Sequence, residues 1–235
     1  MTDSLGLILE YLTSPMFLRG AGVTLLITFV SVFFGILVGL VVALMQESRS
    51  AFLRSLVKSY LWLFRGTPVL FQIIFIYNVL PGIGITLSSV ACGIIALSLN
   101  EGAYMGEIMR SGLQAVGKGQ RSAAAALGLK EWQVIRLVVI PQALRIIIPP
   151  IGNQCIGMLK LSALVSVVAV EELLLVSNQA ASSNFRYFEA LVAAGVYYLL
   201  FTTVFMMIQS RIERWAQDGR RAQPKRVPSE QPIPA

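Results

Sequence analysis

The sequence predicts an all-α integral membrane protein with five transmembrane helices. Of its 235 residues, 56% are hydrophobic and 13% are charged, whereas soluble domains carry about 25% charged residues. Three stretches of 27, 35 and 21 residues contain no Asp, Glu, Lys or Arg, and they cover 20–46, 66–100 and 190–210. A helix needs about 20 apolar residues to cross the core of a bilayer. These stretches are therefore long enough to span a membrane as helices.

The boundaries of each expected element follow from the uncharged stretches and their flanking turn signals. The amino-terminal segment 1–19 contains a short interfacial helix, since Leu, Ile and Tyr recur in it at helical spacing. The short second crossing ends at a Pro-Gly turn, 81–82, and the last turns of the long fourth crossing reach the outer interface at Glu171 and Glu172. The crossings are expected at 20–45, 66–80, 88–109, 146–176 and 190–209.

The positions of the basic residues predict the orientation of the chain. Of the 19 Lys and Arg residues, four lie in 46–65, six in 110–145 and six in 211–235. Cytoplasmic segments carry the excess of positive charge, so the amino terminus is expected outside and the carboxyl terminus in the cytoplasm. The tail 211–235 is also charged and rich in proline, a composition that predicts disorder.

Composition also excludes several kinds of chemistry. The chain has no histidine, which excludes Ser/His/Asp and Cys/His nucleophile systems and imidazole metal sites. Cys92 and Cys155 lie in apolar runs, and two cysteines cannot make a structural zinc site. We therefore expect no bound metal and no catalytic residue in this chain.

The cytoplasmic segment 112–145 is patterned more strongly than a simple connector. It contains two helical patterns, 121–127 and 130–139, separated by Gly128 in the position of a left-handed helix cap. Pro141 is expected to stop the second helix. The pattern predicts a protruding helical hairpin, and the alternative is a helix pair that lies on lipid headgroups.

This segment resembles the EAA motif of permease subunits of ABC importers. The run GQRSAAAALGL at 119–129 and the run VVIP at 138–141 carry the likeness, with Gly128 as the motif glycine. The segments 61–72, 101–116 and 144–167 resemble the polar amino acid branch of that family. Two positions depart from the family pattern, since Ser122 replaces the usual acid and Ala163 replaces a common serine.

The resemblance implies the fold of a type I ABC importer permease, which is not itself an enzyme. It implies a bacterial inner-membrane location, two ATPase subunits that hold ATP and Mg²⁺, a second permease chain that is identical or homologous, and an extracytoplasmic substrate-binding protein. The permease would move a polar amino acid by alternating access and would bind no nucleic acid. The residues implied in ATPase coupling are Gly119, Ser122, Ala123, Ala124, Gly128 and Pro141.

One motif could suggest that the chain binds a nucleotide itself. The run 112–118 fits the first seven positions of a P-loop, but Gly119 stands where Ser or Thr must hold Mg²⁺. The run also follows a predicted transmembrane helix and not a strand. We therefore expect no cofactor on this chain and expect ATP chemistry on a partner.

Two ionisable residues are expected near the middle of the bilayer, where a charge is costly and marks a candidate site. These are Glu101 in the third crossing and Lys160 in the fourth. One interpretation is that they pair and lock two helices together. The other is that they line a cavity for an amino acid, with the ammonium near Glu101 and the carboxylate near Lys160.

Further polar residues extend this candidate substrate site. Asn100, Tyr104, Glu107 and Ser111 recur on one stripe of the third crossing, which predicts that they face a cavity or another helix. Ser166 and Gln72 are additional candidates, and the alternative role of Gln72 is to anchor the chain at 65–67 by hydrogen bonds. The substrate-binding set is Glu101, Lys160, Asn100, Tyr104, Ser166 and Gln72.

A rival function remains open at this point. A secondary transporter or channel would need no ATPase, and uptake by the chain alone under an ion gradient would support it.

Overall fold

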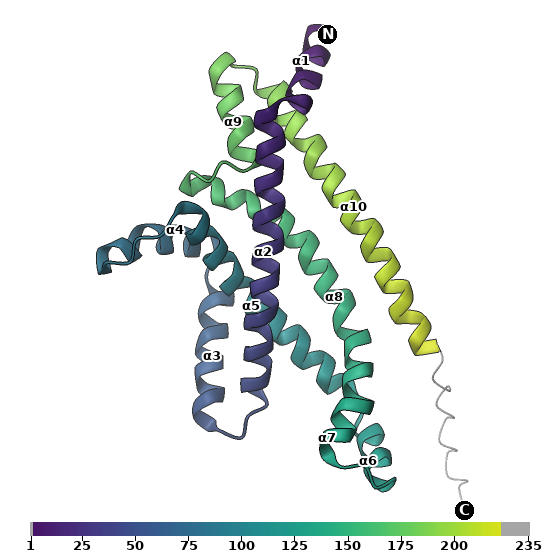
Figure 1. The fold of residues 1–235 in the computed structure, drawn as a ribbon. Coiled ribbons are helices and arrows are strands. Elements are labelled where there is room, and N and C mark those ends of the chain that lie inside the picture. The colour runs from purple at the N-terminus through teal and green to yellow at the C-terminus, as the bar shows by residue number, and fades with distance from the viewer. Residues whose placement is uncertain (1, 222–235) are drawn as a thin grey trace, which may run out of the picture.

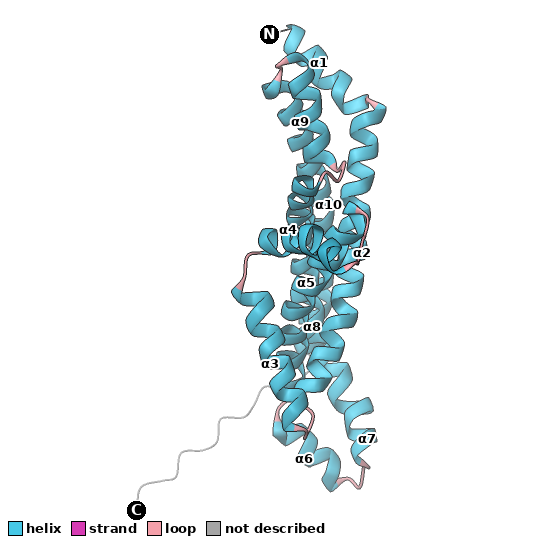
Figure 2. Ribbon diagram, turned by 90° about the vertical axis from the view of Figure 1, so that its left-hand side faces the viewer, coloured by secondary structure: helices cyan, strands magenta, loops and turns pink. Residues whose placement is uncertain are grey.

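The computed structural model describes residues 2–221 and shows, within that range, an elongated bundle of helices without strands (Figure 1). Views at right angles place α1 and α9 at one end of the bundle and α6 and α7 at the other (Figures 1 and 2). The elements are α1 (Thr2–Thr13), α2 (Pro15–Gln46), α3 (Ala51–Gly66), α4 (Val69–Val79), the 3₁₀ turn η1 (Leu80–Ile83), α5 (Ser89–Ala115), α6 (Lys118–Ala126), α7 (Glu131–Gln133), the π-helical η2 (Val134–Val139), α8 (Ile140–Leu161), the 3₁₀ helix η3 (Ser162–Val168), α9 (Leu173–Asn184) and α10 (Tyr187–Arg221).

Three of these helical segments are long and apolar enough to cross a membrane. They are Pro15–Gln46, Glu131–Val168 and Tyr187–Ala216, and the bent pair Ala51–Gly66 and Val69–Ile83 passes the same test when it is taken as one span. The helix α5 is 27 residues long, but it contains Glu101, Glu107 and Arg110 and does not pass that test. The first and fifth expected crossings lie within α2 and α10, and the third matches α5 from its N-cap residue Ser88 onward.

The second expected crossing differs from the prediction. We expected a short segment at 66–80, but α3 begins already at Ala51 and meets α4 at a bend of 103°. Thr67 and Pro68 separate the two helices and adopt extended backbone conformations. Proline disfavours a helical conformation at the residue before it, so α3 ends here and α4 starts in a new direction across the bundle (Figure 1).

The fourth expected crossing is also corrected. Pro141 does not stop the helix, because it lies in the first turn of α8, directly after the π-helical turn η2. The N–H of Ile140 bonds to the carbonyl of Ile135, so the bonding pattern changes where proline lacks a donor. At the other end the helix stops at Val168, followed by Ala169 at φ 59°, and Glu172 is buried.

The last helix, α10, ends later in the chain than expected. The tail was expected to begin at 211, yet α10 continues to Arg221. The expectation of disorder for 222–235 concerns residues outside those that the structure describes.

Glycines bring α2 and α5 into close contact along much of their length. Gly39 on α2 meets Gly106 on α5, while Gly35 packs on Glu101 and Gly102 packs on Val38, as small residues allow in membrane helices. A Cβ atom added to Gly35 would lie 2.8 Å from the Cγ of Glu101, and one added to Gly39 would collide with Met105. Close packing therefore fixes α5, which carries most of the candidate site.

Candidate functional site

A cavity of about 300 Å³ lies where the bend between α3 and α4 meets α5 and α8. Three elements contribute to its lining, which consists of Thr67, Pro68, Val69, Asn100, Glu101, Tyr104, Gln154, Gly157, Met158 and Leu161. Its volume lies at the small end of the range for small-molecule sites, about 300–1,000 Å³. The α3–α4 bend lies roughly halfway along the bundle (Figure 1).

Glu101 is the one ionisable carboxyl group in the lining of this cavity. Its side chain packs on Gly35 and is only 2% exposed. The amide of Gln154 interacts with the carboxyl group, but the buried Oε1 atom has no hydrogen-bond partner among residues 2–221. A buried carboxylate oxygen without a donor is costly, so Glu101 is the lining residue whose negative charge most needs a partner.

Two amide side chains hold the α3–α4 bend. The Nε2 atom of Gln72 donates to the Phe64 carbonyl at 3.0 Å, to the Thr67 carbonyl at 3.1 Å and to the Thr67 hydroxyl at 2.9 Å. Asn100 Nδ2 donates to the Phe64 carbonyl at 2.9 Å and to Gln72 Oε1 at 3.1 Å. The interpretation of Gln72 as a hydrogen-bond anchor is confirmed, and the residue does not line the cavity.

A second cavity, of about 490 Å³, adjoins the first. The two share Tyr104 and Gln154, and the second is also lined by Glu107 and Ser111, so the predicted polar stripe of α5 faces cavities along its length. Arg65 lies over the ring of Tyr104, with Cζ at 5.5 Å from its centroid, and forms an ion pair with Glu107 at 3.6 Å.

The structure does not bring Lys160 and Ser166 to the cavity. Lys160 is exposed on α8, and no ion pair with Glu101 is found in the described part of the chain. Ser166 donates to the Ala163 carbonyl at 2.7 Å within η3. The interpretation of Glu101 and Lys160 as a locking pair is therefore wrong.

Gln154, whose amide interacts with Glu101, is one of the lining residues that were not predicted from the sequence. A signal for it exists, because Pro150, Gln154, Gly157, Met158 and Leu161 follow one another at helical spacing on one face of α8 and line the two cavities. Asn153 and Lys160, which share another face, are both exposed.

The predicted helical hairpin forms one end of the bundle. After α6, Gly128 adopts φ 79°, and its N–H bonds to the Ala125 carbonyl at 2.9 Å while the Leu129 N–H bonds to the Ala124 carbonyl at 3.3 Å. These two bonds make a Schellman cap, as expected for a glycine at this position. The corner carries Leu127, which is 84% exposed.

The candidate coupling residues divide into two groups in the structure. Ala124 is buried in a cluster with Val116, Val134 and Val139, so it fixes α6 to the chain itself. The others are exposed and available to a partner, namely Gly119, Ser122, Ala123, Gly128 and Pro141.

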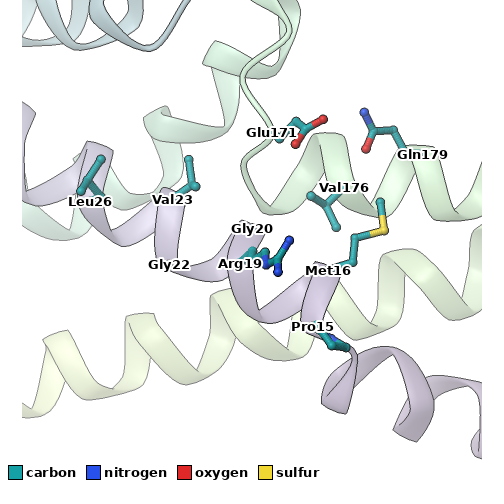
Figure 3. A pocket seen from close by; sticks show the side chains of 10 residues that line it. All are labelled: Pro15, Met16, Arg19, Gly20, Gly22, Val23, Leu26, Glu171, Val176 and Gln179. Carbon is teal, nitrogen blue, oxygen red and sulfur yellow. The ribbon is translucent and has the colours of Figure 1, made fainter.

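A cavity of about 790 Å³ lies at the opposite end of the bundle, between the start of α2 and the segment around α9 (Figure 3). Arg19, Glu171 and Gln179 supply its polar groups. Close by, Glu172 joins α9 to two other helices through hydrogen bonds from the hydroxyls of Thr24 and Tyr198.

Comparison with known proteins gives a consistent result. Residues 31–218 match the family described as binding-protein-dependent transport system inner membrane component. The probable amino-acid ABC transporter permease protein YckA of Bacillus subtilis (strain 168) is 36% identical over 200 residues, which cover 85% of this chain and 88% of that one. The glutamine transport system permease protein GlnP of Escherichia coli (strain K12) is 34% identical over 202 residues, covering 85% and 92%.

Solved structures show the same likeness. A chain in the crystal structure of an amino acid ABC transporter with histidines is 40% identical, with a TM-score of 0.81, and the match covers 85% of this chain and 94% of that one. A chain of the MetNI methionine ABC transporter, at 22% identity and a TM-score of 0.73, shares the fold. The resemblance inferred from the cytoplasmic motif is thus confirmed, and the chain belongs to the family of inner membrane components of binding-protein-dependent transport systems.

Proposed function

We propose that this chain is the permease subunit of an ABC importer that moves a polar amino acid into the cytoplasm by alternating access. The observation that carries the proposal is the buried Oε1 atom of Glu101, which has no partner among residues 2–221 and belongs to a residue lining the cavity halfway along the bundle. An amino acid supplies an ammonium group that would balance the charge of this carboxylate. Relatives named as amino-acid permeases support the same class of substrate.

The proposed topology has five crossings, formed by α2, the bent pair α3 and α4, α5, α8 with η3, and α10. The amino terminus lies outside and the carboxyl terminus in the cytoplasm of a bacterial cell, with the chain in the inner membrane. The distribution of basic residues supports this orientation, because the segments 46–65, 110–145 and 211–235, which this topology places in the cytoplasm, carry 16 of the 19 Lys and Arg residues.

The proposed partners follow from the two ends of the bundle. Two ATPase subunits bind ATP and Mg²⁺ and dock against the exposed residues of the α6–α7 hairpin, Gly119, Ser122, Ala123 and Gly128, with Pro141 beside them. An extracytoplasmic binding protein delivers the substrate at the α1–α9 end. A second permease chain, identical or homologous, completes the translocation unit.

A transport assay with a single amide substitution tests the proposal. The chain is assembled in liposomes with its cognate ATPase and binding protein, and ATP-dependent uptake of radiolabelled amino acids is measured. Glu101→Gln should lower uptake by at least about tenfold, because loss of one partner of a buried charge pair costs about 2 kcal/mol or more. Glu10→Gln makes the same change on an exposed residue of α1 and should leave uptake unchanged.

Two outcomes would contradict the proposal. Full uptake by Glu101→Gln would remove the assigned role of the carboxylate. Uptake driven by an ion gradient with this chain alone would instead establish a secondary transporter.

A further inference from the structure

One side of α10 presents an apolar stripe on the outside of the bundle. Leu200, Val204, Met207 and Ile208 are exposed, and their three- and four-residue spacing places them on one face of the helix. The segment that carries them is long and apolar enough to cross a membrane. This stripe therefore suits contact with the hydrocarbon chains of lipid.

The same stripe ends in two arginines and a tryptophan. Arg211, Arg214 and Trp215 continue the spacing of Met207 and Ile208, and all three side chains are exposed. Tryptophan is enriched at membrane–water interfaces, and arginine near a helix end extends its charged group to the same level. The stripe therefore passes from a part that suits hydrocarbon to a part that suits lipid headgroups.

A third arginine reaches this place from α8. The Cζ atom of Arg145 lies 6.0 Å from the centroid of the Trp215 ring. Gln209 holds the two helices together nearby, because its Nε2 donates to the Pro149 carbonyl at 2.8 Å and its side chain packs on Gly152. Two packed helices therefore contribute to one basic cluster, which consists of Arg145, Arg211 and Arg214.

The chain supplies no carboxylate to this basic cluster. None of the three arginines forms an ion pair within the described residues. Arg214 Nε donates to the Ser210 carbonyl at 3.2 Å, which leaves its terminal nitrogens for another partner. Glu213 lies between the two arginines of α10 in sequence, but it accepts the Nε2–H of Gln209 at 2.9 Å on the α8 side. The positive charge of the cluster is thus available to an anion.

The level of the basic cluster fits the surface of the membrane. The helix α10 ends short of the α6–α7 hairpin, which projects farther at this end of the bundle (Figure 1). The proposed topology places this end in the cytoplasm. The cytoplasmic leaflet carries anionic lipids, and basic side chains directly after a membrane span attract them.

We propose that the basic cluster binds the headgroup phosphate of an anionic phospholipid, whose acyl chains lie along the apolar stripe of α10. Guanidinium groups bind phosphate oxygens in pairs, which makes arginine well suited to this contact. A zwitterionic lipid carries the same phosphate, but its own ammonium group competes with the arginines. The apolar stripe favours a lipid over a soluble phosphate, since a soluble ion covers none of it.

Trp215 can report on this site directly. Replacing the other two tryptophans, Trp62 and Trp132, with phenylalanine leaves Trp215 as the one fluorophore. The full-length chain is placed in phosphatidylcholine vesicles that contain increasing fractions of brominated phosphatidylglycerol or brominated phosphatidylcholine. Bromine quenches tryptophan on contact, so the two quenching curves give the relative affinity of the site for the two lipids. A chain that keeps Trp62 alone, which is 78% exposed on α3, measures the preference away from the site.

The arginines of α10 should determine the preference. With both arginines present, Trp215 should report about tenfold tighter binding of the anionic lipid, and Arg211→Gln with Arg214→Gln should reduce the ratio to within about twofold. Arg211→Lys with Arg214→Lys keeps both charges and should keep most of the preference. The matched control is Arg49→Gln with Lys58→Gln, which removes two exposed basic residues elsewhere and should leave the ratio at Trp215 unchanged.

Four results would overturn the proposal. They are equal quenching by the two lipids before the arginines are changed, a preference that persists without Arg211 and Arg214, an equal loss in the matched control, and a preference of the same size at Trp62. Absence of quenching at Trp215 by either lipid would also contradict it and would indicate that a second permease chain covers this face. Loss of the preference on addition of soluble glycerol phosphate would assign the cluster to a free anion instead.

Single variants keep the test decisive if the double glutamine variant does not fold. Arg211→Gln and Arg214→Gln should each lower the ratio by about threefold, and an unchanged ratio in both would contradict the proposal. The assay involves no transport, so its failure would leave the proposed function standing.

Discussion

At the scale of single residues, Glu101 and Glu172 show two different uses of a buried carboxylate. Glu172 is fully buried, and its Oε1 accepts the Leu175 N–H at 2.8 Å at the start of α9. Its Oε2 accepts the hydroxyl of Tyr198 at 2.9 Å and that of Thr24 at 3.4 Å. Both oxygens of Glu172 are satisfied within the chain, whereas one oxygen of Glu101 is not. We therefore infer a structural role for Glu172, and the contrast supports the ligand-binding role proposed for Glu101.

Removing the Glu172 carboxylate should destabilise the α9 end of the bundle. Glu172→Ala removes the cap of α9, which costs about 1 kcal/mol, and leaves the partly buried Tyr198 hydroxyl without its acceptor, which costs about 1–3 kcal/mol. We expect a loss of about 2–4 kcal/mol and a melting temperature several degrees lower, measured by thermal unfolding of the purified protein in detergent.

Glu171→Ala is the control for this change. The neighbouring carboxylate is exposed, and none of the hydrogen bonds found for the described residues involves it. Its removal should leave the melting temperature within about one degree of the wild type. Equal melting temperatures for the two variants would show that the Glu172 network does not hold the helices together.

The sequence predicted how far along their helices the candidate residues lie better than it predicted which way their side chains point. Glu101 and Lys160 were placed from the length of chain that separates them from the charged ends, and this argument does not say which way each side chain points. Gln154 and Lys160 are six residues apart, which is a rotation of about 240° on an α-helix. Because Lys160 is charged, the prediction placed the site on the face of α8 that is in fact exposed. The cavity lies on the face that carries Gln154.

At the scale of elements, prolines had different effects that the sequence alone did not separate. Pro68 follows the end of α3, where the chain bends by 103°. Pro141 lies in the first turn of α8, after a π-helical turn, and does not end the helix. Pro149 and Pro150 lie inside α8 without ending it. Local propensity predicts a break at each of these positions, but tertiary packing decides which breaks occur. The glycine corner at Gly128 was predictable, because its signal is local and conformational.

The α6–α7 corner should be sensitive to any side chain at Gly128. Its φ of 79° is strongly unfavourable for a β-branched residue, so Gly128→Val should disrupt the Schellman cap and change the direction of the following helix. We expect the importer to retain less than about a tenth of its ATP-dependent uptake, if each misdirected corner weakens ATPase docking by at least about 1.4 kcal/mol. The measurements are uptake in liposomes and co-purification of the ATPase in mild detergent.

Gly117→Val tests whether the effect is specific to the backbone conformation. Gly117 precedes the same helix α6 at φ −56°, and nothing lies within 4 Å of an added Cβ. This variant should keep most of the uptake and the co-purification. Full co-purification of the ATPase with Gly128→Val would contradict a docking role for the corner.

At the scale of the whole molecule, the two cavities near Glu101 lie between the ends that we assign to partners. They share Tyr104 and Gln154 and follow α5 from Asn100 to Ala115, which leads toward the α6–α7 end of the bundle (Figure 2). The fold class could be read from the uncharged stretches and the cytoplasmic motif, since both are properties of the sequence alone. The bend that creates the first cavity could not, because hydrogen bonds between Gln72, Asn100 and residues 64–67 hold it.

Cysteine labelling in intact cells tests whether the bent pair of α3 and α4 carries the chain across the membrane. In a background with Cys92 and Cys155 replaced by alanine, single cysteines are placed at Ala51, Ile83 and Asn178, which are all exposed. The five-crossing topology predicts that a membrane-impermeant maleimide labels Ile83→Cys and Asn178→Cys in intact cells but labels Ala51→Cys only after lysis. Ile83 ends the 3₁₀ turn that follows α4, so its labelling shows on which side of the membrane this crossing ends. Labelling of Ile83→Cys and Ala51→Cys from the same side would make α3 and α4 a re-entrant hairpin, and the orientation of α5 would then reverse.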